Sequence, residues 1–167
     1  MPGPTEHKTV QARILAYAQE IGWIYVPRDE AERRRGFGPH PNPLPEDGAR
    51  GIAERAKKAS LFFGDLLHSQ VRAFNPKYKE AEGALVGEFQ RLHSDIYGNR
   101  DFLTALRNQL KFFSAEDNRE LDITLIDYGD LARPQDDWRN IYEVTEEFYS
   151  HNGRYGTRED VVFLING

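Results

Sequence analysis

The spacing of apolar residues changes along this chain of 167 residues, and that change restricts its fold more than any other feature. Up to about residue 113, apolar side chains recur every three or four positions, which is the period of amphipathic helices. From about residue 121 they alternate with polar residues or form continuous runs, as in β-strands. Helices first and strands afterwards predict a mixed α/β (α+β) domain.

The first part of the chain is predicted to contain four helices. The first follows Thr5, a suitable N-cap, and ends at Gly22. Its apolar stripe has helical spacing and consists of Val10, Ile14, Tyr17 and Ile21. The other three helices are expected over 49–74, 77–95 and 99–113, so that 49–114 forms a largely helical region.

Residues 28–50 interrupt this helical pattern. Three consecutive arginines, Arg33, Arg34 and Arg35, precede a stretch in which prolines recur between positions 39 and 45. Prolines at this density continue neither a helix nor a sheet, so we predict an exposed loop over about 28–50. We interpret the arginines as a solvated charge run, with contact to DNA phosphates as the alternative.

Strand patterns fill the last third of the chain. Strands are expected over 121–128, 141–149 and 161–165, after an isolated short strand at 23–26. The run 161–165 is apolar throughout, as in a strand covered on both faces. Asn166-Gly167 is a strong hairpin signal, so we expect a further strand after it. Without that strand, 161–165 has an unpaired edge, which predicts self-association.

Composition and charge exclude several classes of protein. The net charge of -5 gives no global basic field, so contact with DNA must depend on local basic patches or on partner subunits. The absence of cysteine removes disulfides, thiolate nucleophiles and Cys-ligated zinc, and the five histidines lack the spacing of a zinc site. The N-terminus does not have the pattern of a signal peptide, and no apolar stretch approaches the ~18 residues of a membrane span. We therefore expect a cytoplasmic protein with no membrane partner.

One acidic residue precedes the most apolar strand. Asp160 follows Arg158-Glu159 and comes directly before Val161. A carboxylate at a strand start, with a hairpin partner to follow, suits Mg²⁺, which takes oxygen ligands. Such an ion activates water and stabilises charge at a phosphodiester. From spacing alone, an Asp160 that only ends a turn is the favoured interpretation, and the metal ligand stays open as the alternative.

From about residue 100 onward, the chain resembles the N-terminal nuclease domain of type I restriction enzyme R subunits. The resemblance rests on the order of four stretches: Leu106-Arg107-Asn108, the segment 123–128, the segment 140–148, and 158–167. Residues 6–26 match loosely and 28–95 hardly at all. Two positions depart from the family pattern, because Glu159 replaces its proline and Gln109 its glycine.

The resemblance implies a PD-(D/E)XK nuclease, with a restriction-endonuclease-like mixed sheet flanked by helices. In that family Asp160 corresponds to the metal-binding aspartate, so Mg²⁺ is the implied cofactor. Glu6 resembles the acidic residue that nucleases of this fold often place near the metal; its alternative role is a helix N-terminal carboxylate favoured by the dipole. The family's Glu-x-Lys would lie on a strand after Gly167, which would leave the site of residues 1–167 incomplete.

The resemblance also implies a parent protein, the R subunit of a type I restriction-modification system. Such a subunit is an ATP-dependent DNA translocase and an endonuclease that cuts unmethylated DNA, with specificity and methylation subunits as partners. Residues 22–160 hold no phosphate-binding Gly-Lys-Ser/Thr loop, so ATP would bind in motor domains elsewhere in the parent. We expect the 167-residue chain itself to be inactive. The alternative is a non-catalytic DNA-binding or subunit-docking module.

Overall fold

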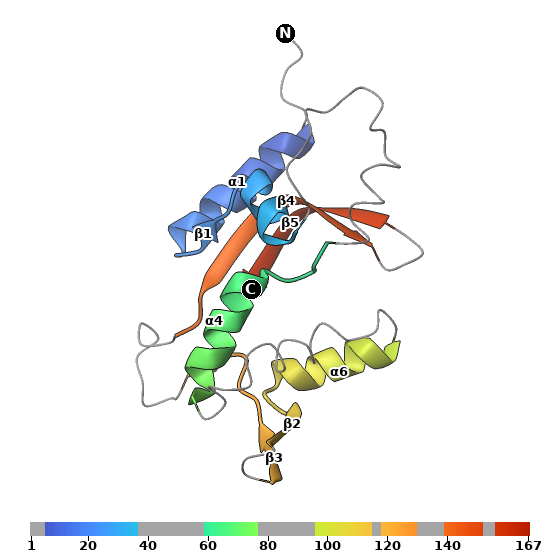
Figure 1. The fold of residues 1–167 in the computed structure, drawn as a ribbon. Helices are drawn as coiled ribbons and strands as arrows, with labels where there is room; N and C mark the ends of the chain where they lie inside the picture. The colour runs from blue at the N-terminus through green and yellow to red at the C-terminus, as the bar shows by residue number, and fades with distance from the viewer. Residues whose placement is uncertain (1–5, 37–58, 77–95, 115–117, 130–138, 152–155) are drawn as a thin grey trace. The chain divides into compact units, whose positions relative to one another are not determined.

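The computed structural model describes residues 6–36, 59–76, 96–114, 118–129, 139–151 and 156–167 (Figure 1). Within these ranges the chain forms four helices and two small sheets, so the predicted mixed α/β class is confirmed. The contacts divide the chain into two compact units, one of 1–63 with 142–164 and one of 64–141 with 165–167. Across the described ranges, the helices are too short or too polar to span a membrane.

The first unit is built on a three-stranded sheet in the order β1-β4-β5. β1 (Ile24–Tyr25) runs parallel to β4 (Tyr142–His151), with Tyr25 opposite Val144. β5 (Gly156–Ile165) follows β4 through a connection too short for a parallel crossover, so this pair is antiparallel. The three strands predicted for this part of the chain are thereby confirmed.

Helix α1 (Glu6–Glu20) packs against β1 and β4, but not through its most apolar side (Figure 1). The buried face consists of Gln11, Leu15 and Ala18. The stripe predicted from the sequence is exposed: Val10 at 52%, Ile14 at 40%, Tyr17 at 63% and Ile21 at 56%. Apolar spacing therefore located the helix correctly but not the face that it buries.

A small core joins α1 to the sheet. Leu15, Ala18 and Val144 are buried together, and Trp23 and Val161 pack against them. Gly22 ends the helix as predicted, with φ +94° and its amide bonded to the carbonyl of Gln19.

Helix α2 (Arg28–Arg34) occupies the start of the region predicted as a loop, so that prediction is wrong for these residues. It follows Pro27, and it carries acidic residues in its first turn and Arg33 and Arg34 in its last, which suits the helix dipole. Gly36, with φ +76°, follows its C-terminal end. The prolines that suggested a loop lie later in the chain, and residues 37–58 are outside the described ranges.

Two of the three consecutive arginines are not solvated, contrary to the prediction. The Arg34 guanidinium donates to Glu143 Oε1 at 2.7 Å and lies 4.2 Å from the centre of the Phe63 ring. Its side chain is 13% exposed and that of Glu143 9%, so the ion pair is buried. Only Arg33, with a side chain 73% exposed and an ion pair to Glu30, matches the predicted solvated run.

Arg35 is buried more deeply still, at 3% exposure. Its guanidinium lies 3.5 Å from the centre of the Phe148 ring and donates to the carbonyls of Ser60 and Tyr149, each at 2.6 Å. Burial lowers its pKa to about 10, which leaves the group charged at neutral pH. Arg34 and Arg35 therefore fasten α2 to β4 and to the segment at Ser60.

The second unit contains α4 (Gly64–Phe74), α6 (Ile96–Leu106) and a hairpin of β2 (Lys111–Ser114) with β3 (Arg119–Asp122). β2 and β3 are antiparallel, and Lys111 pairs with Asp122 in the ladder and through an ion pair of 2.7 Å. α4 buries Leu67, Gln70, Val71 and Phe74, a face with regular helical spacing.

The predicted helical region is confirmed only in part. The helix expected over 49–74 is found from Gly64 onward, while 59–63 are not helical. Residues 49–58 and the helix predicted at 77–95 lie outside the described ranges. The helix expected over 99–113 ends at Leu106, because Asn108 takes a left-handed conformation (φ 56°) that stops it. Residues 111–113 belong to β2, so the helix prediction is wrong there.

The predicted strand over 121–128 is a strand only as far as Asp122. Beyond it, every backbone N–H and C=O group of residues 124–127 pairs with an asparagine side chain. We call this arrangement the asparagine clamp, formed by Asn75, Asn108, Asn140 and Asn166. A primary amide both donates and accepts, so it can stand in for a neighbouring strand.

Each clamped residue has its own asparagine partners: Thr124 is held by Asn75, Leu125 by Asn108 and Asn166, Ile126 by Asn108, and Asp127 by Asn140. The distances lie between 2.6 and 3.1 Å. Asn166 is 1% exposed, and its amide also donates to Asn140 Oδ1 at 2.9 Å. The clamp is therefore a connected network of buried and half-buried amides.

The Asn166-Gly167 pair has the backbone conformation that its sequence predicts. Asn166 has φ 62° and Gly167 has φ 85°. Two successive positive φ angles are what the central residues of a type I′ turn require. The strand expected after this turn stays a prediction.

Candidate functional site

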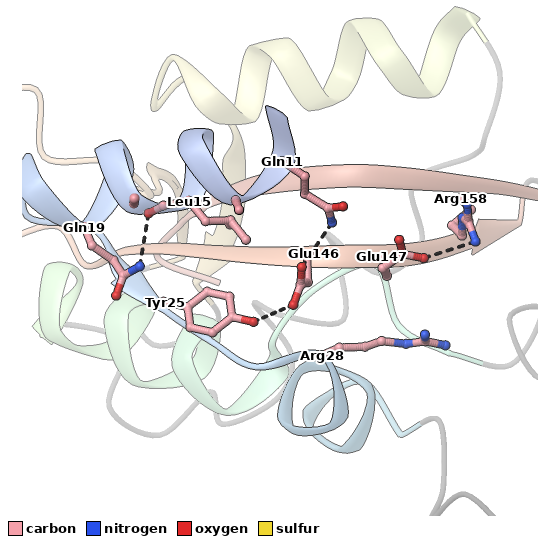
Figure 2. Close-up of a pocket in the computed structure, with 10 residues that line it drawn as sticks. Gln11, Leu15, Gln19, Tyr25, Arg28, Glu146, Glu147 and Arg158 are labelled. Carbon is pink, nitrogen blue, oxygen red and sulfur yellow. Dashed lines mark hydrogen bonds and ion pairs between the residues drawn. The ribbon is translucent and has the colours of Figure 1, made fainter. Parts of the chain in front are cut away.

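The first unit contains a pocket of about 960 Å³ between α1, the start of α2 and the strands β4 and β5 (Figure 2). Its walls combine apolar helix residues with charged and amide side chains: Gln11, Ala12, Leu15, Ala16, Gln19, Tyr25, Arg28, Glu146, Glu147 and Arg158. The amide of Gln19 donates to the Leu15 carbonyl of its own helix at 3.1 Å, so it turns back onto α1. The remaining polar side chains of the pocket lie on the strands or reach toward them from the helices.

Glu146 is held by donors on both of its carboxylate oxygens. The Tyr25 hydroxyl donates to Oε1 at 2.6 Å, and Gln11 Nε2 donates to Oε2 at 3.1 Å. Figure 2 shows both donors directed at Glu146 from different elements, Tyr25 from β1 and Gln11 from α1. Burial, together with the hydrogen bond and charge of Glu146, raises the pKa of Tyr25 to about 12, so its hydroxyl stays a donor at physiological pH.

Gln11 links this carboxylate to the neighbouring strand. The same Nε2 that donates to Glu146 also donates to the backbone carbonyl of Asp160 at 2.8 Å. Gln11 is 7% exposed, and a buried amide is stable only where its polar atoms have partners. One side chain of α1 therefore joins β4 and β5 at the position of Asp160.

Glu147 lines the same pocket as Glu146, although consecutive residues of a regular strand point to opposite faces. Glu147 has φ 53°, a left-handed conformation that costs about 1–2 kcal/mol for a residue with a Cβ. Left-handed residues inside strands are typical of bulges, which redirect side chains. The strained residue thus explains why two adjacent carboxylates border one pocket.

Arg158 balances part of this negative charge. Its Nη1 lies 3.2 Å from Glu147 Oε2. A hydrogen bond with Tyr149 and the charges of Glu147 and Asp160 raise the pKa of Arg158, which therefore stays protonated. The pocket thus holds both signs of charge, with carboxylates on β4 and a guanidinium on β5.

The two residues predicted for the site have different outcomes. Asp160 lies within β5, which begins at Gly156, so it neither precedes the strand nor ends a turn as the sequence suggested. It is partly buried and its carbonyl accepts from Gln11 of α1, but it is not among the residues that line the pocket. Glu6 is the first residue of α1, but its side chain lies outside the described residues, so its place near a metal is untested. Among the described residues, no three His, Cys, Asp or Glu side chains group as a metal centre.

Sequence reasoning missed Gln11, Tyr25 and Glu146. Gln11 escaped because it lies on the less apolar face of its helix, which the stripe at Val10 and Ile14 made look exposed. Glu146 did carry a signal, because Glu146-Glu147 interrupts the alternation of apolar and polar residues that runs through β4. Glu146 also lies in the stretch 140–148 that resembles the family, whereas Gln11 and Tyr25 lie in the loosely matching segment 6–26.

A comparison with protein-family models matches the type I restriction enzyme R protein N terminus over residues 3–167. The chain belongs to this family. Searches of curated proteins and of solved structures give no match. The family match extends well beyond the part of the chain, from residue 100 onward, in which the sequence resemblance was clearest.

The structure gives a physical meaning to the stretches by which this R-subunit N-terminal region resembles its family. Asn108, Asn140 and Asn166 each lie in one of those stretches, and the fourth stretch, 123–128, contains the segment that they hold. The same stretch that ends in Asn166 also contains Asp160. The resembling stretches thus contain three of the four clamp asparagines, all but Asn75, as well as Asp160.

Proposed function

We propose that residues 1–167 form the N-terminal part of a Mg²⁺-dependent endonuclease of the PD-(D/E)XK type, within the R subunit of a type I restriction-modification enzyme. The parent protein would translocate DNA with ATP and cut unmethylated DNA in a cytoplasmic complex with specificity and methylation subunits. Family membership supports the R-subunit assignment. The reaction, the metal and the partners are the proposal.

The position of Asp160 carries the proposal. Its strand is joined by Gln11 to Glu146 on the neighbouring strand, so two carboxylate-bearing residues belong to one hydrogen-bonded group. Oxygen donors of this kind are what Mg²⁺ takes, usually one or two protein carboxylates with water and substrate phosphate. Asp160 would hold the ion, which when bound activates water and stabilises charge at a phosphodiester.

The remaining residues would act on the carboxylates and on the substrate. Tyr25 and Gln11 keep Glu146 oriented by donating to its two oxygens. Arg158 provides a cation beside these carboxylates that can contact a DNA phosphate. Glu6 is proposed as a further acidic residue of the site, and the Glu-x-Lys of the family would come from residues after Gly167.

The decisive test is Asp160→Asn in the R subunit assembled with its partner subunits, acting on unmodified plasmid DNA. Cleavage is expected to be lost, while DNA-dependent ATP hydrolysis continues. Glu159→Gln is the matched control, because Glu159 is the adjacent carboxylate and its Oε1 is occupied by Ser150 at 2.9 Å. Cleavage by Asp160→Asn at the wild-type rate refutes the assignment.

The 167-residue chain alone offers a second test. With Mg²⁺ and plasmid DNA it is expected to cut nothing, because residues 161–167 contain no Glu-x-Lys to complete the site. Robust nicking by this chain would place the active site among other residues than those proposed.

A docking or DNA-binding module without catalysis is the second candidate. The exposed apolar stripe of α1, with Tyr17 at 63% and Ile21 at 56%, favours a contact with another protein surface. In that case Asp160→Asn would leave cleavage intact, while Tyr17→Asp with Ile21→Asp would weaken assembly of the subunits. Measuring both properties in the two variants separates the candidates.

A further inference from the structure

We propose that Gln11 is a positioning residue, which sets where the part of β5 that contains Asp160 lies relative to Glu146 of β4. The inference rests on the proposed function, since it assigns Gln11 a role in the same nuclease site. Gln11 would touch neither metal nor DNA. It would act only through the two residues to which it donates.

One nitrogen makes both hydrogen bonds. Gln11 Nε2 donates to Glu146 Oε2 at 3.1 Å and to the Asp160 carbonyl at 2.8 Å. A primary amide nitrogen has two hydrogens, and both are used here. The reversed amide would place its oxygen against two acceptors, so the contacts fix the orientation of the side chain.

The bridge limits the separation of the two strands at this point. Because both acceptors bind one atom, the Glu146 carboxylate oxygen and the Asp160 carbonyl oxygen lie no more than about 6 Å apart. Gln11 itself is anchored, since Leu15 and Ala18 on the same face of α1 are buried against the sheet. A fixed helix therefore determines where the backbone of Asp160 lies.

The direction of the Asp160 side chain follows from the position of its backbone. A displacement of about 1 Å in a catalytic group can lower the rate of a reaction by roughly a hundredfold. A Gln11 that only packs the helix would affect stability alone. A positioning role requires an effect on metal binding and on the local opening of β5.

The test compares Gln11→Met and Gln11→Lys in the full R subunit. Methionine keeps the length of the side chain but has no donor, while the lysine ammonium can donate to both oxygens. Arg13→Met is the control, because Arg13 lies on the same helix, is exposed and is not among the residues that line the pocket. The first measurement is amide hydrogen exchange of residues 160–162 in metal-free protein. The second is the Mn²⁺ binding that Asp160→Asn removes.

Gln11→Met is expected to speed exchange at 160–162 and to weaken Mn²⁺ binding, each by roughly tenfold, the equivalent of one hydrogen bond. The half-saturating Mg²⁺ concentration for cleavage should rise by a similar factor. Gln11→Lys should lie closer to the wild type in all three measurements, and Arg13→Met should match the wild type.

The possible failures are distinguishable. If Gln11→Met shows wild-type exchange and Mn²⁺ affinity while Asp160→Asn abolishes cleavage, the positioning role is wrong and the nuclease assignment stands. If Asp160→Asn cleaves normally, the nuclease assignment fails whatever Gln11 does. If Gln11→Met does not fold, wild-type exchange in Gln11→Lys supports the proposal, and fast exchange in Gln11→Lys overturns it.

Discussion

Asn75 pairs with Thr124 as a neighbouring strand would: its Nδ2 donates to the Thr124 carbonyl and its Oδ1 accepts from the Thr124 amide, both at 2.8 Å. Asn75→Ala removes both partners and is expected to lower the free energy of unfolding by roughly 2–4 kcal/mol, because polar groups lose their bonds away from water. Urea denaturation measures the change, with the exposed Gln109→Ala as control. Equal midpoints for Asn75→Ala and wild type would show that the clamp does not stabilise the unit.

Substitutions on the two faces of α1 should show that stability depends on the buried face and not on the more apolar one. Leu15 is 8% exposed, and Leu15→Ala is expected to lower the free energy of unfolding by about 2–5 kcal/mol. Tyr17 is 63% exposed although it belongs to the apolar stripe, so Tyr17→Ser should change it by no more than about 0.5 kcal/mol. Thermal unfolding of the two variants checks the prediction, and the reverse order would mean that the stripe is the packed face.

The period of apolar residues predicted the elements that depend on local sequence. The helix ending at Gly22 and the three strands of the first sheet were found where expected. The face that α1 buries was not predictable from local sequence. The buried Gln11 finds its hydrogen-bond partner in Glu146, which is 135 residues away in sequence. Asp160 was predicted from its place before an apolar run and from the family resemblance, and its role stays a prediction, whereas no motif marked Gln11.

Burial of the arginines was missed for the same reason. Arg34 and Arg35 look like any surface charge run until Glu143 and Phe148, more than a hundred residues later, are brought against them. The clamp is a third case, because the asparagines bond a segment that has the pattern of a strand but no strand beside it in the described residues. Partners distant in sequence decide these features, and local periodicity does not report them.

Removing one partner of the buried ion pair of Arg34 and Glu143 should destabilise the protein more than removing both. Arg34→Met leaves the Glu143 carboxylate, 9% exposed, without this guanidinium, and is expected to lower the free energy of unfolding by about 3–5 kcal/mol. The double variant Arg34→Met with Glu143→Leu should recover most of that loss, because no charge is then buried at this pair. A double-mutant cycle in urea measures the coupling. A double variant as unstable as Arg34→Met would contradict this account.

Tyr25 predicts a stability change in alkaline solution. Its pKa is about 12 in the folded protein against a reference value of 10.0, so the unfolded chain releases the phenolic proton first. The stability contributed by this residue is therefore complete below pH 10 and is lost as the pH rises from 10 to about 12. Tyr25→Phe should show a flatter decline over that range in urea denaturation at fixed pH values. Parallel declines in both proteins would place the alkaline transition elsewhere.

The outer strand of the first sheet should promote self-association of the 167-residue chain. In the described residues β5 has only β4 as a sheet neighbour, and Phe163 and Ile165 on it are 48% and 40% exposed. An unpaired edge with apolar side chains invites pairing with a second chain. Sedimentation velocity should show a concentration-dependent increase in mass that Ile165→Lys reduces. A strictly monomeric wild-type chain would count against the prediction.

The asparagine clamp determines which residues of this region can differ among relatives. Because the four amides pair with main-chain groups of residues 124–127, this pairing does not itself specify the side chains of that segment. The pairing depends instead on four residues that are far apart in sequence, namely Asn75, Asn108, Asn140 and Asn166. Among relatives, we expect these asparagines to persist where residues 124–127 have diverged.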